Sequence, residues 1–193
     1  MPLTTLDPNT ALLVIDLQKG LVNGDFIHPI AEVIHRTRAL IDVFRTRHLP
    51  VVLVNVAGRA PGRTEQGPRG GTSFSEKWTE LLPQLDQQPD DIAVTKRSWG
   101  AFATTDLERR LKARGVTQVV VTGIVTSVGV EATARQAYEQ GFHVTLALDA
   151  MTDLREEAHQ YCIRNVFPRV GETGSSPEII SLLEEPERGV SAS

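Results

Sequence analysis

The sequence predicts a three-layer α/β/α fold around a mainly parallel central sheet. Short, continuous apolar runs alternate along the chain with longer stretches of helical periodicity, as expected for strands that helices bury on both faces. Several of these runs also end at a polar or glycine-rich position, where such sheets bind ligands. The chain has 193 residues, 40% of them hydrophobic, which suits one well-buried domain. We expect a single domain over residues 1–193, with a frayed tail from about residue 186.

The first half of the chain contains three predicted strands, one long helix and one long loop. The strands are runs of aliphatic residues over 11–15, 51–56 and 91–95. Apolar residues recur at helical spacing over 30–48, which predicts an amphipathic helix. Residues 57–75 are rich in Gly, Pro and Arg, and loops of this length in compact domains are often functional.

The second half continues the alternation of strands and helices. Thr105 and Glu108 fit a capping box for a helix that Gly115 ends, and Asp153 with Glu156 is predicted to cap another. The predicted strands cover residues 116–122 and 142–148, and the predicted helices cover 105–114, 127–140, 153–165 and 176–184.

Charge and cysteine content restrict the location and the partners of the protein. The net charge of −4 requires no basic face, so we expect no nucleic-acid partner. Residues 1–10 lack the architecture of a signal peptide, and the apolar run 11–15 is too short to span a bilayer. Cys162 is the single cysteine, which excludes an internal disulfide. We therefore expect a cytoplasmic protein in which Cys162 is a structural thiol.

We expect neither a metal nor a cofactor. No histidine lies at a ligand spacing from another His or Asp. The glycines Gly67, Gly70 and Gly71 do not follow a strand, as the glycines of a phosphate-binding loop would. The five histidines are His28, His35, His48, His143 and His159.

Two charged residues follow predicted strands directly. Asp16 follows 11–15 and Lys96 follows 91–95, so both are expected at the carboxyl edge of the sheet. Burial raises the pKa of a carboxyl and a nearby ammonium lowers it, so such a pair can hold a proton ready for transfer. The alternative is a structural ion pair in which Asp16 caps a turn.

Other residues near these strand ends have two interpretations each. Trp99 and Phe102 can wall a pocket for a ring-shaped ligand, although core packing explains such a pair equally well. Arg59 and Arg63, with Arg69 in the same long loop, form either a solvated loop or a site that captures an anionic substrate or a neighbouring subunit. Asp149 is expected to end a strand and cap the next turn.

Position 129 holds a glycine where the local construction favours a nucleophile. Residues 119–131 run from an apolar strand through a sharp turn into a helix. Residue 129 therefore lies near a helix N-terminus, where N–H groups and the helix dipole favour negative charge. A cysteine there would be a nucleophile of low pKa. Because Gly129 has no side chain, chemistry at this site proceeds without covalent attack from that position.

Three motifs give the chain a resemblance to the isochorismatase-like hydrolases, which include cysteine amidohydrolases such as nicotinamidases. The motifs are residues 12–18 (LLVIDLQ), 95–102 (TKRSWGAF) and 121–135 (VTGIVTSVGVEATAR). The resemblance extends over residues 11–183 and implies a Rossmann-type α/β/α fold. It also implies a homo-oligomer, either a dimer or a tetramer.

The resemblance assigns roles to particular residues. In the cysteine-dependent branch it implies an Asp–Lys–Cys triad, in which Asp16 and Lys96 match the first two members and Gly129 occupies the position of the cysteine. Ile124–Val125 matches the place of a non-proline cis peptide bond that aims N–H groups at the substrate. The metal-binding histidines of nicotinamidases have no counterpart in residues 55–59 (NVAGR), so the departures argue against nicotinamidase activity.

These features favour enol-ether hydrolysis of the isochorismate type on a small carboxylated substrate. An enol ether needs an acid and water but no protein nucleophile, so Asp16 would be the acid and Lys96 would tune it. Arg59, Arg63 or Arg97 would bind the substrate carboxylate. One alternative is hydrolysis of an amide or other C–N bond, because residues 126–128 resemble the amidase branch. The other is a small-molecule binding protein that has lost its nucleophile.

Overall fold

The computed structural model describes residues 3–65 and 74–185. The predicted frayed tail from residue 186 lies outside the described residues. So do Gly67, Arg69, Gly70 and Gly71, and the central part of the loop predicted over 57–75.

One six-stranded sheet runs through the molecule in the order β3-β2-β1-β4-β5-β6. Each pair of neighbouring strands is parallel, which confirms the predicted fold class. The strands are β1 (Thr10–Ile15), β2 (Val51–Val56), β3 (Ile92–Lys96), β4 (Gln118–Ile124), β5 (His143–Thr152) and β6 (Glu172–Gly174). The sixth strand was not predicted, because its three residues, Glu-Thr-Gly, carry no apolar pattern.

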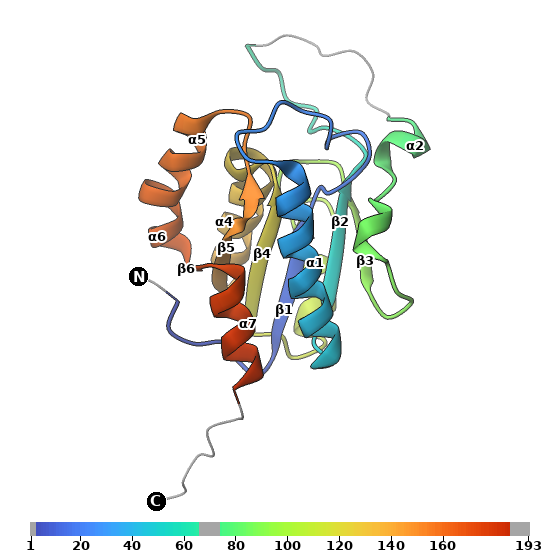
Figure 1. The fold of residues 1–193 in the computed structure, drawn as a ribbon. Coiled ribbons are helices and arrows are strands. Elements are labelled where there is room, and N and C mark those ends of the chain that lie inside the picture. The colour runs from blue at the N-terminus through green and yellow to red at the C-terminus, as the bar shows by residue number, and fades with distance from the viewer. Residues whose placement is uncertain (1–2, 66–73, 186–193) are drawn as a thin grey trace, which may run out of the picture.

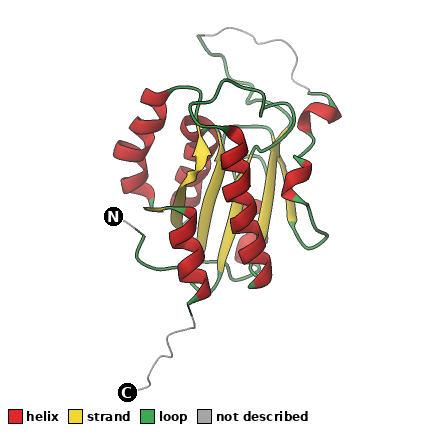
Figure 2. Ribbon diagram, in the orientation of Figure 1, coloured by secondary structure: helices red, strands yellow, loops and turns green. Residues whose placement is uncertain are grey.

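Helices cover both faces of this sheet (Figures 1 and 2). The α-helices are α1 (Ile30–Thr46), α2 (Glu76–Thr79), α3 (Leu107–Lys112), α4 (Glu131–Glu139), α5 (Glu156–Tyr161), α6 (Phe167–Val170) and α7 (Ser176–Glu184). A 3-10 turn, η1 (Pro83–Leu85), follows α2. Two π-helical turns, η2 (Thr126–Val130) and η3 (Cys162–Val166), directly precede α4 and α6. The helices predicted over 127–140 and 153–165 therefore exist, each with a wider turn at one end.

The core has one apolar layer on each side of the sheet. Leu13 of β1 belongs to the layer that α3, α4 and α6 cover, and its neighbour Leu12 belongs to the layer that α1 and α7 cover. All six residues of β1 are buried, which explains its continuous apolar sequence. Full burial of a leucine side chain contributes about 1.5–3 kcal/mol, so β1 anchors the residues that follow it.

Two predicted caps differ from the structure. The capping box of Thr105 and Glu108 does not form: the hydroxyl of Thr105 donates to the Ala101 carbonyl at 2.6 Å, and Glu108 pairs with Lys112 at 2.6 Å. Asp153 does not cap α5, whose N-cap is Arg155, without a side-chain hydrogen bond. The Thr105 hydroxyl also accepts from the N–H of Leu107 at 3.2 Å, and the Asp153 carboxylate accepts from the N–H of Ser127 at 2.7 Å. Local spacing reveals neither arrangement.

β5 is longer than predicted and continues to Thr152. Asp149 therefore lies inside the strand instead of ending it. Its carboxylate accepts hydrogen bonds from the backbone and hydroxyl of Ser176 at 2.6 and 2.7 Å, and it pairs with Arg36 at 2.8 Å. Asp149 thus ties α1 and the start of α7 to the sheet. α7 also has the capping box of Ser175 with Glu178, and its bounds match the prediction for 176–184.

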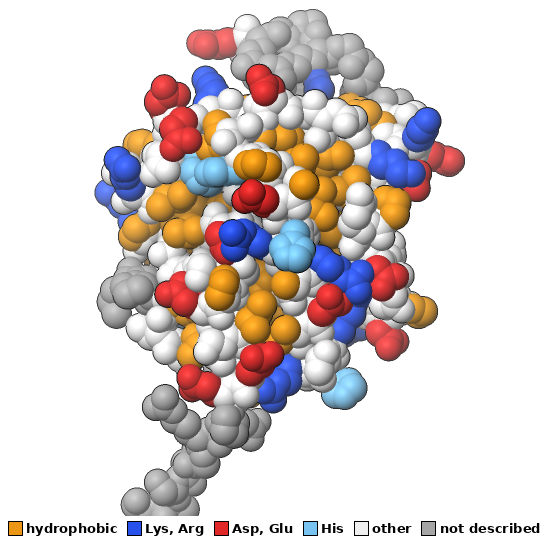
Figure 3. Space-filling view, viewed as in Figure 1, with side chains coloured by type: hydrophobic (Ala, Val, Ile, Leu, Met, Phe, Trp, Pro, Cys, Tyr) orange, Lys and Arg blue, Asp and Glu red, His pale blue; other side chains and the backbone are white. Residues whose placement is uncertain are grey.

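Positive and negative side chains are interspersed over the face that carries α1 and α7 (Figure 3). None of the helices in the described part of the chain combines the length and apolar character needed to cross a membrane.

Candidate functional site

Asp16 lies immediately beyond the carboxyl end of β1. Its N–H donates to the Val54 carbonyl of β2 at 2.9 Å, which continues the strand ladder by one residue. Its φ of 57° then turns the backbone away from the sheet. Non-glycine residues adopt this left-handed conformation uncommonly, and Asp is among those that tolerate it best. The carboxyl group is held in a buried position, with only 6% of the residue exposed.

Lys96 ends β3 and reaches the same carboxyl group. Its side chain is 1% exposed and its ammonium lies 2.8 Å from Oδ2 of Asp16. The ammonium also donates a hydrogen bond to the carbonyl of Trp99. β2 separates β1 from β3 in the sheet, so the tertiary structure brings together two residues that are 80 positions apart.

Burial controls the electrostatics of the pair. Desolvation raises the pKa of Asp16 to about 6, and the charge and hydrogen bond of Lys96 offset only part of this rise. Oδ1 of Asp16 is buried without a hydrogen-bond partner among the described residues. A carboxyl group with such a pKa is protonated for a useful fraction of the time near neutral pH, which general acid–base chemistry requires.

Gly129, which follows β4 in the chain, faces the same carboxyl group. It lies in η2, between β4 and α4. A Cβ atom at this position would lie 2.8 Å from Oδ2 of Asp16 and 3.1 Å from the carbonyl oxygen of Ile124. The three predicted site residues Asp16, Lys96 and Gly129 therefore meet at one point. Any side chain at 129 would press directly on the carboxyl group.

The turn before Gly129 has polar supports that the sequence did not reveal. The peptide bond between Ile124 and Val125 is cis, as the resemblance implies. The N–H of Ser127 donates to Oδ2 of Asp153 at 2.7 Å, and Oδ1 of Asp153 accepts from the N–H of Leu154 at 2.8 Å.

A buried histidine also contacts this turn. Nδ1 of His159 lies 2.9 Å from the hydroxyl of Thr126, and burial lowers the pKa of His159. Asp153 and Asp16 share one signal in the sequence, an Asp that closely follows an apolar strand, and this signal could have identified Asp153.

The aromatic residues after Lys96 take different positions. Phe102 is buried in the core at 5.9 Å from the ring of Phe142, which is the core-packing arrangement and not a pocket wall. Trp99 is 67% exposed, and its carbonyl accepts a hydrogen bond from the Lys96 ammonium. The contribution of Trp99 is therefore a backbone acceptor, which side-chain reasoning does not detect.

Arg59 lies over an aromatic stack. Its guanidinium is 5.5 Å from the centre of the Phe74 ring, which stacks on Trp78 at 4.0 Å. The Trp78 carbonyl accepts a hydrogen bond from the side chain of Gln18, two residues after Asp16. The stack is thus tied to the chain segment that carries Asp16. Arg63, from the same predicted cluster, is exposed.

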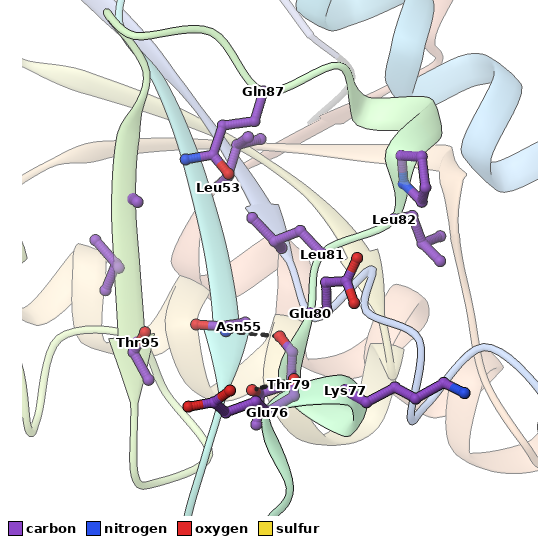
Figure 4. Close-up of a pocket in the computed structure, with 13 residues that line it drawn as sticks. Leu53, Asn55, Glu76, Lys77, Thr79, Glu80, Leu81, Leu82, Gln87 and Thr95 are labelled. Atoms are coloured by element: carbon purple, nitrogen blue, oxygen red, sulfur yellow. Dashed lines mark hydrogen bonds between the residues drawn. The ribbon is translucent and has the colours of Figure 1, made fainter.

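A groove of about 840 Å³ lies between strands β2 and β3 and the segment that contains α2 and η1 (Figure 4). Asn55 and Thr95 from the strands face Glu76 and Thr79 from the α2 segment, and the Asn55 amide donates to the Thr79 carbonyl at 2.7 Å. None of the predicted site residues lines this groove, so it is separate from Asp16 and Lys96.

The described residues hold neither a cluster of metal ligands nor a reactive thiol. In residues 3–65 and 74–185 no three His, Cys, Asp or Glu side chains come together as a metal site. Cys162 is buried, and burial raises the pKa of its thiol to about 11. A thiol of that pKa is inert near neutral pH.

Comparisons with known proteins agree on one family. The family model described as "Isochorismatase domain" matches residues 10–178. The uncharacterized isochorismatase family protein YwoC of Bacillus subtilis is 37% identical over 181 residues, covering 91% of this chain and 94% of that protein. Nicotinamidase 3 of Arabidopsis thaliana is 32% identical and covers 83% of each chain.

A solved structure has the same arrangement of elements. An isochorismatase family protein from Burkholderia thailandensis superposes with a TM-score of 0.89 at 35% identity, covering 94% of this chain and 98% of that one.

Proposed function

Because the chain belongs to the isochorismatase family of hydrolases, we propose that it hydrolyses a small carboxylated enol ether without a cysteine nucleophile. The observation that carries this proposal is the buried Asp16 carboxyl, paired with Lys96 at 2.8 Å and facing a glycine at position 129. A cysteine hydrolase needs a thiolate at that position. An acid-catalysed hydrolase needs only the acid and room for water.

The proposed reaction uses Asp16 as acid and then as base. Protonated Asp16 gives its proton to the terminal vinyl carbon of the enol ether, which leaves an oxocarbenium ion at the neighbouring carbon. Water adds to that carbon and returns a proton to Asp16, and the resulting hemiketal breaks into pyruvate and an alcohol. A general acid of this kind contributes roughly 10²- to 10⁴-fold to the rate, and a pKa of about 6 keeps part of Asp16 protonated at neutral pH.

Lys96 and the turn at Ile124–Val125 have supporting roles in this proposal. Lys96 stabilises the ionised form of Asp16 after proton transfer and orients the water. We assign stabilisation of the reacting oxygen to free N–H groups of the turn before Gly129, because helix N-termini favour negative charge. These steps need neither a metal nor a cofactor.

We assign recognition of the substrate carboxylate to the arginines at the rim. A guanidinium binds a carboxylate through two parallel hydrogen bonds. Arg59, positioned by the Phe74 ring, is the first candidate. Arg97 is the second, because its guanidinium already lies at 3.2 Å from the Ala57 carbonyl in the same loop.

Amide hydrolysis is the second candidate function, and the likeness to nicotinamidase 3 favours it. In that reaction Asp16 would activate water directly against a C–N bond, without a covalent intermediate. A binding protein without catalysis is the third candidate. A carboxyl of raised pKa, poised for proton transfer, supports catalysis over binding alone.

We further propose a cytoplasmic homo-oligomer, a dimer or a tetramer, with a small-molecule substrate and no nucleic-acid partner. Light scattering of the purified protein tests the oligomeric state, and a monomer at micromolar concentration would contradict it.

The deciding experiment is an assay with isochorismate that follows pyruvate release. We expect turnover by the wild type and a loss of at least about 10²-fold in Asp16→Asn. Pyruvate release that Asp16→Asn leaves intact rules out the proposed acid. Absence of turnover by the wild type rejects this substrate, and a panel of amides then tests the second candidate.

A further inference from the structure

The chain segment after Lys96 is fastened to helix α4 by two side chains. The N–H of Ala101 donates to the hydroxyl of Thr133 at 3.1 Å, and the N–H of Phe102 donates to Oε1 of Gln136 at 3.0 Å. Thr133 and Gln136 are three residues apart and so lie on the same face of α4. The neighbouring Gly100 allows the close approach, since a Cβ there would lie 2.3 Å from Oε1 of Gln136.

The hydroxyl of Thr133 makes a second hydrogen bond, to the other half of the site. It donates to the carbonyl of Gly129 at 2.7 Å, and the residue is completely buried. One hydroxyl therefore joins the position that faces Asp16 to the segment that follows Lys96. Both its donor and its acceptor capacity are used.

The same segment supplies the second acceptor for Lys96. The ammonium is held between Oδ2 of Asp16 and the carbonyl of Trp99. Trp99 lies two residues before Ala101, so the contact of Ala101 with Thr133 limits where the Trp99 carbonyl can be. A side chain that is only 1% exposed cannot replace a lost acceptor with bulk water.

We propose that Thr133 and Gln136 are positioning residues for the reaction: they hold the Trp99 carbonyl against the Lys96 ammonium and so fix the ammonium against Asp16. The inference rests on the proposed roles of Asp16 and Lys96. It adds that α4 connects position 129 to Lys96, so that Gly129 and Lys96 keep their positions relative to each other.

The test is a direct titration of Asp16 in the full-length protein. The carboxyl carbon of Asp16 is followed by ¹³C NMR, with Asp16→Asn for assignment, in the wild type, Thr133→Val and Thr133→Ser. Thr37→Val is the matched control, because the Thr37 hydroxyl is also buried in a helix but has no hydrogen-bond partner among the described residues. Lys96 is the charged group that contacts Asp16, so the titration reports the placement of its ammonium.

We expect Thr133→Val to raise the midpoint of the Asp16 titration by about one pH unit, because a displaced ammonium stabilises the carboxylate less. Thr133→Ser, which keeps the hydroxyl, and Thr37→Val should titrate as the wild type does. An unchanged midpoint in a folded Thr133→Val protein overturns the proposal, and so does an equal shift in Thr37→Val.

A second variant and a substrate-free readout complete the experiment. If Thr133→Val does not fold, Gln136→Met removes the other acceptor at a partly exposed site and is judged by the same shift. Because the titration needs no substrate, a failure of this inference is distinguishable from a failure of the proposed reaction, which the pyruvate assay detects.

Discussion

Lys96 holds one oxygen of Asp16 and leaves the other unengaged: its ammonium lies 2.8 Å from Oδ2, while Oδ1 has no hydrogen-bond partner in the described part of the chain. This asymmetry suits a carboxyl group that has to bind and release a proton. Oδ2 stays fixed by the ammonium, and no donor among the described residues competes for Oδ1. Gly129 keeps the space beside this carboxyl free of a side chain.

The rate of the reaction should fall as pH rises through the pKa of Asp16. If protonated Asp16 is the acid, kcat/KM decreases about tenfold per pH unit above pH 6. The measurement is a pH–rate profile of pyruvate release between pH 4.5 and 8.5. A profile that is flat from pH 5 to 8 would show that the acid is a different group.

The stability of the fold should depend on the protonation of Asp16. Its pKa is raised from 3.8 to about 6 in the folded state, so the folded protein binds the proton more tightly than the unfolded chain between these pH values. The free energy of unfolding therefore falls as pH rises from about 4 to 6, by about 3 kcal/mol in total, and stays lower above pH 6.

The difference in unfolding free energy between the wild type and Asp16→Asn isolates this effect, since other groups titrate in both proteins. Urea unfolding at pH 4, 5, 6 and 7 measures it. A difference that does not change with pH would mean that the carboxyl titrates as it does in the unfolded chain.

A cysteine at position 129 should create a reactive thiol. Gly129→Cys places a thiol beside the Asp16 carboxyl, which contacts the Lys96 ammonium, near a helix N-terminus. The ammonium and the helix N-terminus lower a thiol pKa, and the carboxylate can accept the thiol proton. We expect one equivalent of rapid iodoacetamide labelling at pH 7 by mass spectrometry. The wild type should remain unlabelled, because burial raises the pKa of Cys162, its single cysteine, to about 11.

The same position tests the need for open space. Gly129→Ala adds only a Cβ, 2.8 Å from Oδ2 of Asp16, and should lower the rate of enol-ether hydrolysis. Gly129→Cys should lower this rate by the same factor. The carboxyl has to shift to make room, so we expect a cost of about 1–3 kcal/mol in unfolding free energy. Full activity in Gly129→Ala would argue against a role for the missing side chain.

Asp153 should be important for the turn that carries Gly129. It is 2% exposed and accepts backbone N–H groups of Ser127 and Leu154. Asp153→Ala leaves these partly buried donors without their acceptor, which should cost about 1–3 kcal/mol in unfolding free energy. Asp42→Ala, which removes an exposed partner of Arg38, should cost less than about 1 kcal/mol. Equal losses in the two variants would contradict the proposed anchoring.

The fold class followed from patterns that are local in the sequence. β1 and β2 are continuous apolar runs because both faces of each strand are buried, and the capping box at the start of α7 is complete within four residues. β6 and the caps of α3 and α5 could not be predicted. β6 is a three-residue strand that exists through its pairing with β5. The N-cap residues of both helices, Asp106 and Arg155, make no side-chain cap hydrogen bond, so neither start carries a capping pattern in the sequence.

The sequence by itself determined that two charged residues lie at strand ends, Asp16 after β1 and Lys96 at the end of β3, and that Gly129 lies in the turn between β4 and α4. An apolar run that stops at a charged residue is a local signal, and it places that residue at the edge of a parallel sheet. The sequence could not distinguish the two interpretations of Phe102, or indicate that Trp99 contributes its carbonyl and not its ring.

Only the tertiary structure decided how these strand ends act on one another. The distance of 2.8 Å between Asp16 and Lys96 and the raised pKa of Asp16 depend on how completely neighbouring segments exclude water. Thr133 and Asp153 each connect such segments by hydrogen bonds to residues distant in the sequence. Desolvation and hydrogen bonding of this kind are properties of packed surroundings, and the order of residues along the chain does not specify them.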